Sequence, residues 1–517
     1  MKMNTWVLAA AVLSAAALDP SGAANVLGLF PYPGVSHFVV YEPLMKALAA
    51  RGHRVTVYSH FPQRQPSPNY TDVSLAGSMP LVVENVPFFP GIGTNNIFTD
   101  VCGIEATALN TCEATLESHA MQELMKSNES FDLVFTEMFH SDCMLPFVHK
   151  FQAPHIAMFS SVHMTWTDYR FGNPTNPSYI PTQFSPGIYR MNFLQRLKNT
   201  FFSVYLKWYY DWYVEPAINA MAAKHFGESL PPMHEIAKNT SLLLLNTSPL
   251  LNLPRAMVPA VVEVAGIHLP QIKKLPQDIQ KFMDEAEHGV VLFTFGSTIR
   301  PEAMPEEVTA AMAAAFAELP QRVLWKGNPG GVPNLSPNVM MRRWLPQIDV
   351  LRHPGIRVFM THGGQLGVIE AVYNAVPMVT IPLFADQHRN SIALVDKGVA
   401  VLLPLLEATE ERILSALRQV LNDPGYKERA EELSRAFRDW RTSPLETAVF
   451  WSEYVLRHGG APHLRSAAVD APLAQYLLLD VLAAAVVAVA SLLLCCRLLT
   501  RRVTTLCRGS PDKLKAH

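Results

Sequence analysis

The sequence has no excess of charge of either sign. Its 517 residues include 42 Lys and Arg against 44 Asp and Glu, which gives a formal net charge of −2. Proteins that bind nucleic acid neutralise the phosphate backbone with clustered basic residues, so we expect no nucleic-acid partner. Short repeats and low-complexity segments are absent as well. With 49% hydrophobic residues, the chain has enough apolar material for two packed domains.

Cysteine is scarce and does not set the fold. Of the six cysteines, only Cys102, Cys112 and Cys143 precede the hydrophobic segment near the C-terminus. An odd number cannot pair completely, and a disulfide between Cys102 and Cys112 is the pairing that we consider.

The two ends of the chain predict a signal peptide and a membrane anchor. Lys2 and an apolar stretch up to Leu18, followed by small residues, have the layout of a signal peptide over residues 1–24. Residues 476–499, which include LLLDVLAAAVVAVASLLLCC, are long enough at ~1.5 Å per residue to cross ~30 Å of hydrocarbon. The basic tail at 500–517 then faces the cytoplasm, and the chain before the span faces a lumen or the outside.

The last five residues favour the endoplasmic reticulum. KLKAH places lysines three and five residues from the C-terminus, which resembles a dilysine retrieval signal, with a plain basic tail as the alternative. We therefore predict a single-pass type I protein of the endoplasmic reticulum membrane with its folded domains in the lumen. Four sequons fit lumenal exposure, although the last lies in an apolar run that suggests burial: Asn69, Asn128, Asn239 and Asn246.

Apolar runs alternate with helical patterns along most of the chain. Runs such as VLGLF at 26–30 are typical of strands that are buried on both faces of a sheet. We predict such strands at residues 26–30, 54–59, 132–137, 155–160, 241–247, 290–297, 322–327, 357–362 and 378–383. Their alternation with helices predicts an α/β protein with two doubly wound, Rossmann-like domains.

The domain boundaries follow from these patterns. We expect an N-terminal domain over residues 25–265, a C-terminal domain over 266–460 and a juxtamembrane segment at 461–475. Ligands of open parallel sheets bind at the carboxyl ends of the strands, so the residues after each run are candidates for a site.

Two turns that follow predicted strands of the C-terminal domain suit the binding of a diphosphate. Gly296 and Ser297 follow one run, and His362, Gly363 and Gly364 follow another. Glycine lets backbone N–H groups approach a ligand, and the N-terminus of the next helix favours negative charge. Either turn alone is more often a simple tight turn. The GxGxxG motif of dinucleotide-binding dehydrogenases is absent.

Residues 344–387 add partners for a base, a ribose and a sugar in that order. An aromatic face can stack on a base, an amide can donate and accept, and carboxylates can accept from hydroxyls. The side chains are Trp344, Gln347, Glu370 one helical turn beyond Gly367, Asp386 and Gln387. The alternative for Trp344 is a core residue, and the alternative for Glu370 is a solvated helix face. The order of the whole series argues against both.

This segment is similar throughout to the donor-binding signature of the UDP-glycosyltransferases. The chain also has their FGS turn at 295–297, the approach PRAMVPAVVEVAGIHL and the segment FWSEYVLRHGGAPHLR at 450–465. The likeness covers nearly the whole chain and is strongest to microsomal type I members of animals, invertebrate members above all. It implies a GT-B fold, with two Rossmann-like domains that face a central cleft, and transfer of a hexose from a UDP-sugar.

The resemblance implies a role for each donor-site residue. Trp344 stacks on uracil, Gln347 contacts the uridine and Glu370 holds the ribose. Contacts to the diphosphate and the sugar fall to Ser297, His362, Gly363, Gly364, Gly367, Asp386 and Gln387. Between Gly364 and Gly367 the family commonly carries an asparagine–glycine pair, whereas this chain has Gln365, Leu366 and Gly367, which leaves the detail of the phosphate contact open.

Catalysis is expected in the N-terminal domain. After the strand VLGLF, Ser36 is a candidate N-cap that puts His37 in the first turn of a helix. The positive end of a helix disfavours imidazolium, so this histidine is suited to accept a proton from an acceptor hydroxyl. The family places its catalytic base here, and the resemblance therefore implies that role for His37.

A carboxylate partner would orient the imidazole. The segment DLVFTEMFHSDCMLPF offers Glu137 at the strand end and Asp142 five residues later. Position favours Glu137, whereas residue type favours Asp142, because the family uses an aspartate just after its fourth strand. We prefer Asp142 and keep Glu137 as the alternative, and an N-cap or surface carboxylate is the simpler explanation of either.

The parts suggest an inverting mechanism without a metal. One base, with no second carboxylate set to form a glycosyl-enzyme, favours direct displacement at the anomeric carbon, while helix N-termini and His362 meet the charge of the leaving diphosphate. Glycosyltransferases of the other main fold hold a metal with an Asp-x-Asp pair, which this chain lacks. We expect no metal and no cofactor, with the UDP-sugar as co-substrate.

The acceptor is expected to be a small lipophilic alcohol, phenol or steroid. Residues 188–214, dense in aromatics with scattered Arg and Lys, suit helices that rest on a membrane surface, with interior packing as the alternative. Some of the following could line an apolar pocket, while most will be core: Phe88, Phe89, Phe98, Phe139, Phe159, Met164 and Trp166.

Resemblance to invertebrate members favours UDP-glucose as the donor. A UDP-glucuronate donor would want a cation at its carboxylate, for which Arg255 and Arg389 are candidates. Two other classes stay open, a non-catalytic UDP-sugar-binding subunit and a glycosyltransferase that acts on a lipid or protein of the secretory pathway. The sequence leaves a homo-oligomer open as well.

Overall fold

The computed structural model describes residues 22–83, 91–94, 96–139, 141–185, 190–269, 273–297, 299 and 303–508. The chain divides into two compact units, Met1–Arg465 and Ser466–His517. Most of the expected signal peptide, Phe88, Phe89 and the KLKAH tail lie outside the described residues.

The N-terminal half is built on a seven-stranded parallel sheet with the order β3-β2-β1-β4-β5-β6-β7. β1 lies between β2 and β4, so the chain winds outward in both directions from the β1–β4 pair. The strands are β1 (Asn25–Phe30), β2 (Arg54–Ser59), β3 (Tyr70–Ser74), β4 (Leu133–Glu137), β5 (His155–Phe159), β6 (Leu242–Leu245) and β7 (Val261–Glu263). Their carboxyl ends form one edge, where β1 and β4 finish side by side.

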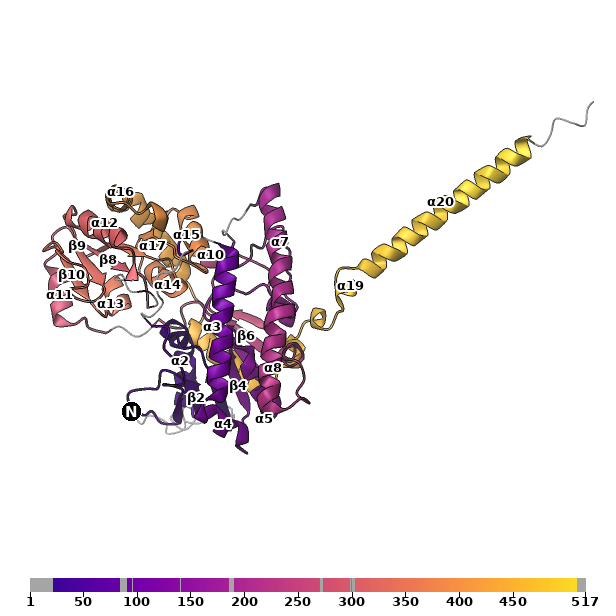
Figure 1. The fold of residues 1–517 in the computed structure, drawn as a ribbon, viewed down its shortest axis with the longest axis horizontal. Helices are drawn as coiled ribbons and strands as arrows, with labels where there is room; N and C mark the ends of the chain where they lie inside the picture. Colours follow the sequence, from indigo (N-terminus) through magenta and orange to yellow (C-terminus); the bar gives the residue numbers. More distant parts are fainter. Residues whose placement is uncertain are drawn as a thin grey trace, which may run out of the picture. The chain divides into compact units, whose positions relative to one another are not determined.

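Helices connect these strands and bury apolar faces against the sheet (Figure 1). They are α2 (Val35–Ala50), α3 (Ile97–Glu117), α4 (His119–Lys126), η1 (Asp142–Met144), α5 (Leu145–Phe151), α6 (Asp168–Phe171), α7 (Phe193–Tyr209), η2 (Tyr210–Val214), α8 (Glu215–Phe226), α9 (Met233–Ala237) and α10 (Pro249–Asn252). η2 is a π-helical turn that continues α7 into α8.

The C-terminal half repeats the design with a six-stranded parallel sheet of order β10-β9-β8-β11-β12-β13. Its strands are β8 (Val290–Thr294), β9 (Arg322–Lys326), β10 (Val339–Arg342), β11 (Ile356–Thr361), β12 (Met378–Thr380) and β13 (Ala400–Leu402). Its helices are α11 (Gln277–Asp284), α12 (Glu306–Ala317), α13 (Gln347–Leu351), α14 (Gln365–Tyr373), α15 (Gln387–Asp396), η4 (Leu405–Glu407), α16 (Glu410–Asn422) and α17 (Pro424–Arg438). The expected pair of doubly wound parallel sheets is therefore confirmed.

The nine expected strands are the interior ones, and the four that the patterns missed are the edges. β3, β7, β10 and β13 occupy the ends of the two sheets. Each is only three to five residues long and partly exposed, as in YTDVS and VVE. In β3 and β7 a charged residue interrupts the continuous apolar run on which the prediction depended.

Helix α18 (Pro444–Arg457) returns to the N-terminal half, although we expected the C-terminal domain to extend to residue 460. It contacts α2 and adds Ala448, Val449 and Val455 to the core under the first sheet. The chain thus crosses between the halves twice, near Gly266 and again near Trp440. A β-carbon built on Gly266 would lie 3.5 Å from the Trp440 ring, so the two crossings touch.

The second unit contains the candidate membrane helix. α20 (Leu479–Arg508) follows the short helix α19 (Leu473–Tyr476), and its segment Leu479–Cys507 is long and apolar enough to span a membrane. The helix begins three residues after the expected start at 476, because Leu478 takes a positive φ of 55° that interrupts the helix.

The observed disulfide joins Cys112 to Cys143 and ties α3 to η1. The pairing of Cys102 with Cys112 that we considered is wrong, since Cys102 is a free, exposed thiol. Cys102 and Cys112 both lie on α3. Ten residues of helix separate their Cα atoms by ~15 Å, far beyond the reach of a disulfide.

Candidate functional site

A histidine and a glutamate meet where β1 and β4 end. His37 lies in the first turn of α2, directly after β1, and Glu137 is the last residue of β4. His37 Nδ1 is 2.5 Å from Glu137 Oε1. The histidine side chain is 16% exposed and the glutamate 1%, so the pair presents the imidazole, and not the carboxylate, to solvent. A histidine held through Nδ1 keeps Nε2 for a substrate proton.

Aromatic side chains fix this pair. Tyr41, one turn after His37 on α2, donates its hydroxyl to the same Glu137 oxygen at 2.9 Å. The rings of Tyr32 and Phe139 pack on the imidazole at centroid distances of 4.3 and 4.6 Å. Burial, with the charge of Glu137 adding to it, raises the pKa of Tyr41 well above its usual value, so this hydroxyl remains a donor.

Asp142, our preferred partner for His37, is engaged elsewhere. It forms a buried ion pair with Arg170 and accepts a hydrogen bond from the Tyr210 hydroxyl. Asp142 opens the helical turn η1, which carries it away from the strand end, while Glu137 is still on the strand beside β1. The preference for Asp142 over Glu137 is therefore corrected.

The start of α2 also differs in one detail. The N-cap is Gly34, in an extended conformation and without a side-chain cap, and Ser36 lies inside the first turn. His37 nevertheless occupies the expected position in that turn, so the error shifts the helix start without moving the histidine.

The two glycine turns of the second sheet lie together. β8 and β11 are neighbours, and Gly296 and His362 follow them. A β-carbon on Gly296 would lie 2.6 Å from the His362 ring and one on Gly364 2.5 Å from it, so both glycines are needed for this close approach. Burial, with the charge of Lys326 adding to it, lowers the pKa of His362 to about 4, so the ring is neutral at pH 7. Ser297 follows Gly296 and is partly buried.

Trp344 exposes its ring at the carboxyl end of this sheet. The side chain is 64% exposed, which excludes the core role that was the alternative. Lys326, at the end of β9, lies over the ring at 5.2 Å and donates to the Gly296 carbonyl at 2.6 Å. A flat aromatic face beside a cation is thus open to a ligand, next to the first glycine turn.

Glu370 and Gln347 contact one another. Gln347 Nε2 donates to Glu370 Oε2 at 2.7 Å, and Gly367 lies beside Gln347 Nε2. Burial raises the pKa of Glu370 to about 7. His268 Nε2, from the segment that links the halves, lies 3.8 Å from Glu370 Oε1.

Asp386 and Gln387 begin α15 and face the N-terminal half. Asp386 Oδ2 accepts from Ser161 Oγ at 2.8 Å and from Asn390 at 3.0 Å. Burial raises the pKa of Asp386, against the lowering effects of those two hydrogen bonds and of the nearby charge of His37. Gln387 accepts from the Leu383 backbone at 2.8 Å, which fixes the turn. The sugar-binding candidates and the candidate base therefore face each other across the two halves.

Gln365 takes part in the contact between the halves. Its amide donates to the Asn246 carbonyl and exchanges hydrogen bonds with the Asn252 side chain, all at 3.0 Å. Asn246 is 0% exposed and donates to the Ser160 carbonyl at 2.9 Å, so its sequon is buried as the apolar run suggested. This use of Gln365 accounts for a residue that departs from the expected family pattern.

Residues 90–508 match the protein family described as "UDP-glucoronosyl and UDP-glucosyl transferase". The chain belongs to the UDP-glycosyltransferase family. It is 42% identical to UDP-glucosyltransferase 2 of Dactylopius coccus over 474 residues, 90% of either chain. It is 32% identical to UDP-glucuronosyltransferase 2B15 of Rattus norvegicus over 503 residues, 92% of this chain and 93% of the relative.

Solved structures support the fold of this UDP-glycosyltransferase. A UDP-glucose: anthocyanidin 3-O-glucosyltransferase in complex with UDP matches with a TM-score of 0.56 at 16% identity, over 84% of this chain and 99% of that one. The calicheamicin glycosyltransferase CalG4 matches with a TM-score of 0.57 at 20% identity, over 84% and 99%. The chain is a glycosyltransferase enzyme with the GT-B fold and one C-terminal helix that could span a membrane.

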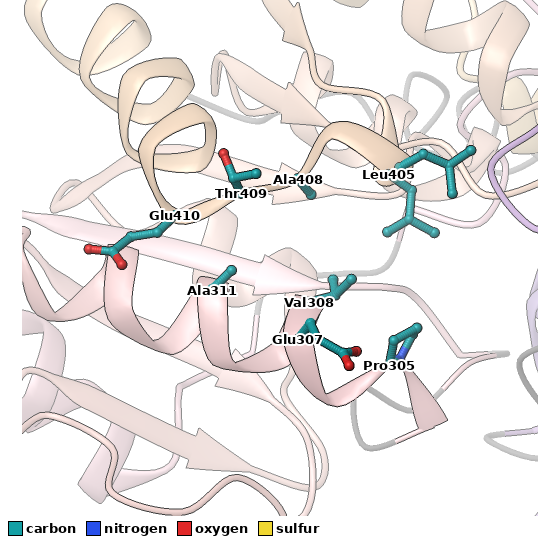
Figure 2. Close-up of a pocket in the computed structure, with 9 residues that line it drawn as sticks. Pro305, Glu307, Val308, Ala311, Leu405, Ala408, Thr409 and Glu410 are labelled. Carbon is teal, nitrogen blue, oxygen red and sulfur yellow. The ribbon is translucent and has the colours of Figure 1, made fainter.

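A hollow that the structure describes in this UDP-glycosyltransferase lies away from the donor residues. A cavity of about 390 Å³ lies between the start of α12 and the η4–α16 turn, lined by side chains that include Val308, Leu405 and Glu410 (Figure 2). No predicted site residue lines it. Within the described ranges, no group of three or more His, Cys, Asp or Glu side chains could hold a metal ion.

Sequence reasoning missed several residues of the site. Ser161, Lys326 and His268 contact Asp386, the Gly296 turn and Glu370. Asp100, in the first turn of α3, accepts from the Ala385 backbone N–H at 3.3 Å, next to Asp386. Lys326 and Ser161 stand at or just after predicted strands, where a search of strand ends would have found them. Asp100 carries no such signal.

Proposed function

We propose that this enzyme transfers glucose from UDP-glucose to a hydroxyl of a small lipophilic acceptor, with His37 as the general base. The observation that carries the proposal is the contact of His37 with Glu137 opposite Asp386. A carboxylate behind the imidazole stabilises the positive charge that develops when Nε2 takes the acceptor proton. Asp386 would then hold sugar hydroxyls near the base.

The donor fits the C-terminal half in the order that the sequence suggests. Uracil stacks on exposed Trp344, and the ribose hydroxyls donate to Glu370. The diphosphate lies at the Gly296 and His362 turns, where backbone N–H groups, the neutral imidazole and the nearby ammonium of Lys326 favour negative charge. These groups would stabilise the leaving UDP without a metal or other cofactor.

Glucose is favoured over glucuronate because the two candidate arginines are engaged with the protein. Arg255 pairs with Asp168 at 3.0 Å. Arg389 donates to the backbone carbonyls of Pro181, Thr182 and Asn252. The relative at 42% identity is named a glucosyltransferase and the one at 32% a glucuronosyltransferase, which points the same way.

We expect inversion at the anomeric carbon of the sugar because neither nearby carboxylate is placed to act as a nucleophile. Glu137 is 1% exposed behind His37, and Asp142 is paired with Arg170, so neither is presented as a nucleophile for the anomeric carbon. Direct attack by the acceptor oxygen on an α-linked donor would give a β-glycoside. We place the two sheets on the lumenal side of the endoplasmic reticulum, anchored by α20 with its basic end in the cytoplasm.

Microsomes that contain the full chain provide the test. They are incubated with UDP-glucose, UDP-glucuronate or UDP-galactose and a panel of lipophilic phenols and alcohols, and products are identified by mass spectrometry. We expect glucosides of β configuration, and their loss in His37→Ala. His234→Ala is the matched control, since His234 also bonds a carboxylate, Glu215 at 2.6 Å, outside the site. Unchanged product formation in His37→Ala would remove the assignment of the base, and glucuronides alone would overturn the donor.

A further inference from the structure

A short segment of the N-terminal half, residues 91–94, is anchored in the C-terminal half. Ile92 is 1% exposed and belongs to a hydrophobic core of the second sheet. Gly93 donates its N–H to the Leu383 carbonyl at 2.6 Å. Its φ of 80° is left-handed, and a β-carbon on it would lie 3.0 Å from Leu405 Cβ, so glycine suits this close approach. The segment is therefore fixed against the loop that follows β12.

The next helix, α3, places a buried carboxylate against the same loop. Asp100 lies in the first turn of α3 and is 8% exposed. Its Oδ2 accepts from the Ala385 N–H at 3.3 Å. Asp100 does not cap α3, because Asn96 has that role and accepts from the Phe98 N–H at 3.0 Å. The carboxylate of Asp100 thus contacts the other half instead of the start of its own helix.

The hydrogen bond to Ala385 stabilises a strained turn. The φ of Ala385 is 56°, in the left-handed region that an alanine rarely enters. The next residue is Asp386, which begins α15 and accepts from Ser161 Oγ at 2.8 Å and from Asn390 at 3.0 Å. The turn at Ala385 sets the direction in which Asp386 leaves the loop. A contact that holds this turn therefore also holds the Asp386 carboxylate.

We propose that Asp100 is a positioning residue for the sugar of the donor. It holds Ala385 in its left-handed conformation and thereby keeps Asp386 in place for the sugar hydroxyls. The inference rests on the proposed function, in which Asp386 binds those hydroxyls. It adds that the N-terminal half contributes to the donor site through α3, on a helix that carries none of the residues expected to touch the donor.

The charge of Asp100 suits this role at neutral pH. Burial raises its pKa to about 6, against the lowering effect of the Ala385 N–H, so the carboxylate is mostly ionised at pH 7. A hydrogen bond to an ionised carboxylate is roughly twice as strong as one between neutral groups. Ile92 and Gly93 hold the chain shortly before α3 begins, which keeps Asp100 beside the loop.

Calorimetric titration of the purified full chain with UDP-glucose and with UDP separates the sugar from the nucleotide and needs no acceptor. The variants are Asp100→Ala, Asp100→Asn, which keeps an acceptor oxygen, and Asp100→Ala combined with Ala385→Gly, because glycine takes a positive φ without support. Asp386→Ala is the reference for loss of the sugar contact. Glu105→Ala is the matched control, since Glu105 is a buried carboxylate on the same helix that accepts from Tyr209 on α7. Parallel titrations with UDP-glucuronate make the result independent of which sugar is transferred.

We expect Asp386→Ala and Asp100→Ala to raise the Kd for the UDP-sugar about 5- to 20-fold and the Kd for UDP less than about twofold. Asp100→Asn and the double variant should regain most of the lost affinity, which a purely structural role of Asp100 would not predict. Glu105→Ala should bind both ligands as the wild type does.

The outcomes separate this inference from the proposed function. A loss of sugar affinity in Asp386→Ala without one in Asp100→Ala would overturn the inference alone. Equal loss of affinity for UDP, no recovery in the double variant, or the same selective loss in Glu105→Ala would assign the effect to general damage and would overturn it as well. No effect of Asp386→Ala would remove the sugar contact from the proposed function, and this inference with it.

Discussion

His37 Nδ1 and Glu137 Oε1 lie 2.5 Å apart although 100 residues separate them in the sequence. The register of two parallel strands brings them together, since β1 and β4 pair from Val26 with Leu133 to Leu29 with Thr136. The histidine follows one strand and the glutamate ends the other. The candidate base therefore lies where ligands of open parallel sheets bind, at the carboxyl ends of the two strands between which the strand order reverses.

Loss of the Glu137 charge should slow the reaction without removing the donor site. Glu137→Gln keeps the size of the side chain but no longer stabilises an imidazolium, so we expect kcat to fall by about 10²- to 10⁴-fold. The KM for UDP-glucose should change little, because the donor is held by the other half. Steady-state kinetics with a phenol acceptor measure both constants. A kcat within twofold of the wild type would show that Glu137 has no part in the proton transfer.

Asp142→Asn should lower the free energy of unfolding, whereas Glu137→Gln should lower kcat. Arg170 would remain buried without its carboxylate, which costs about 3–5 kcal/mol of unfolding free energy. In the wild type burial lowers the pKa of Arg170 and the charge of Asp142 more than offsets this, so the variant loses the group that stabilises the guanidinium charge. Thermal denaturation gives the loss. The double variant Asp142→Leu with Arg170→Met should recover part of it, and a stable but inactive Asp142→Asn would restore our original preference.

Trp344→Ala should weaken nucleotide binding and leave the fold intact. Stacking of a base on an aromatic ring is worth about 1–3 kcal/mol, so the Kd for UDP should rise roughly 10- to 100-fold. The melting temperature should stay within a degree or two of the wild type, because the ring is 64% exposed and supports no core. Phe450→Ala, at 50% exposure on the returning helix α18, is the control for loss of an exposed aromatic ring. Calorimetric titration with UDP decides the matter.

Glu370 should make donor binding depend on pH near neutrality. Burial raises the pKa of Glu370 to about 7, and the ionised carboxylate accepts from ribose hydroxyls, so affinity for UDP-glucose should rise as the pH increases through 7. UDP-glucose has no titrating phosphate in this range, which removes the ligand as a cause. In Glu370→Gln the affinity should be lower and independent of pH between 6 and 8. An unchanged pH dependence in this variant would assign the effect to another group.

The raised pKa of Glu370 also makes the free energy of unfolding depend on pH, in the direction opposite to that of donor affinity. The folded protein holds the Glu370 proton more tightly than the unfolded chain does. The contribution of Glu370 is therefore fully present below its unfolded pKa of 4.5 and is lost as the pH rises to about 7. Relative to Glu370→Gln, the wild type should lose melting temperature between pH 5 and pH 8. Differential scanning calorimetry at several pH values checks this direction.

The sequence predicted the parts of the fold that are buried on both faces. Interior strands such as β8 (VVLFT) and β11 (IRVFMT) are nearly all buried and carry four and three consecutive apolar residues, because helices cover both sides of the sheet. The edge strand β3 (YTDVS) has no such run and is partly exposed. The edge strand β13 does lie in an apolar run, VAVLL at 399–403, and was missed although the run is there.

The candidate donor residues could be proposed from the sequence because they occupy one continuous stretch, whereas contacts between the halves could not. Trp344, Gln347 and Glu370 lie within 27 residues of each other. Ser161 and Asp386 touch at 2.8 Å across 225 residues. No local pattern encodes such a pair, because it depends on how two separately folded sheets come together. The choice between Glu137 and Asp142 failed for a related reason, since the turn η1 redirected the second carboxylate.

The double crossing between the halves limits how this enzyme can move. The chain passes from one half to the other near Gly266 and back near Trp440, and the two passages touch. A single tether would let the halves swivel freely. Two neighbouring connections act as a hinge, because a twist of one half against the other would stretch one connection and compress the other. Any motion of the halves that admits a UDP-sugar would thereby be confined to one axis, and a nick in either passage would leave both halves attached.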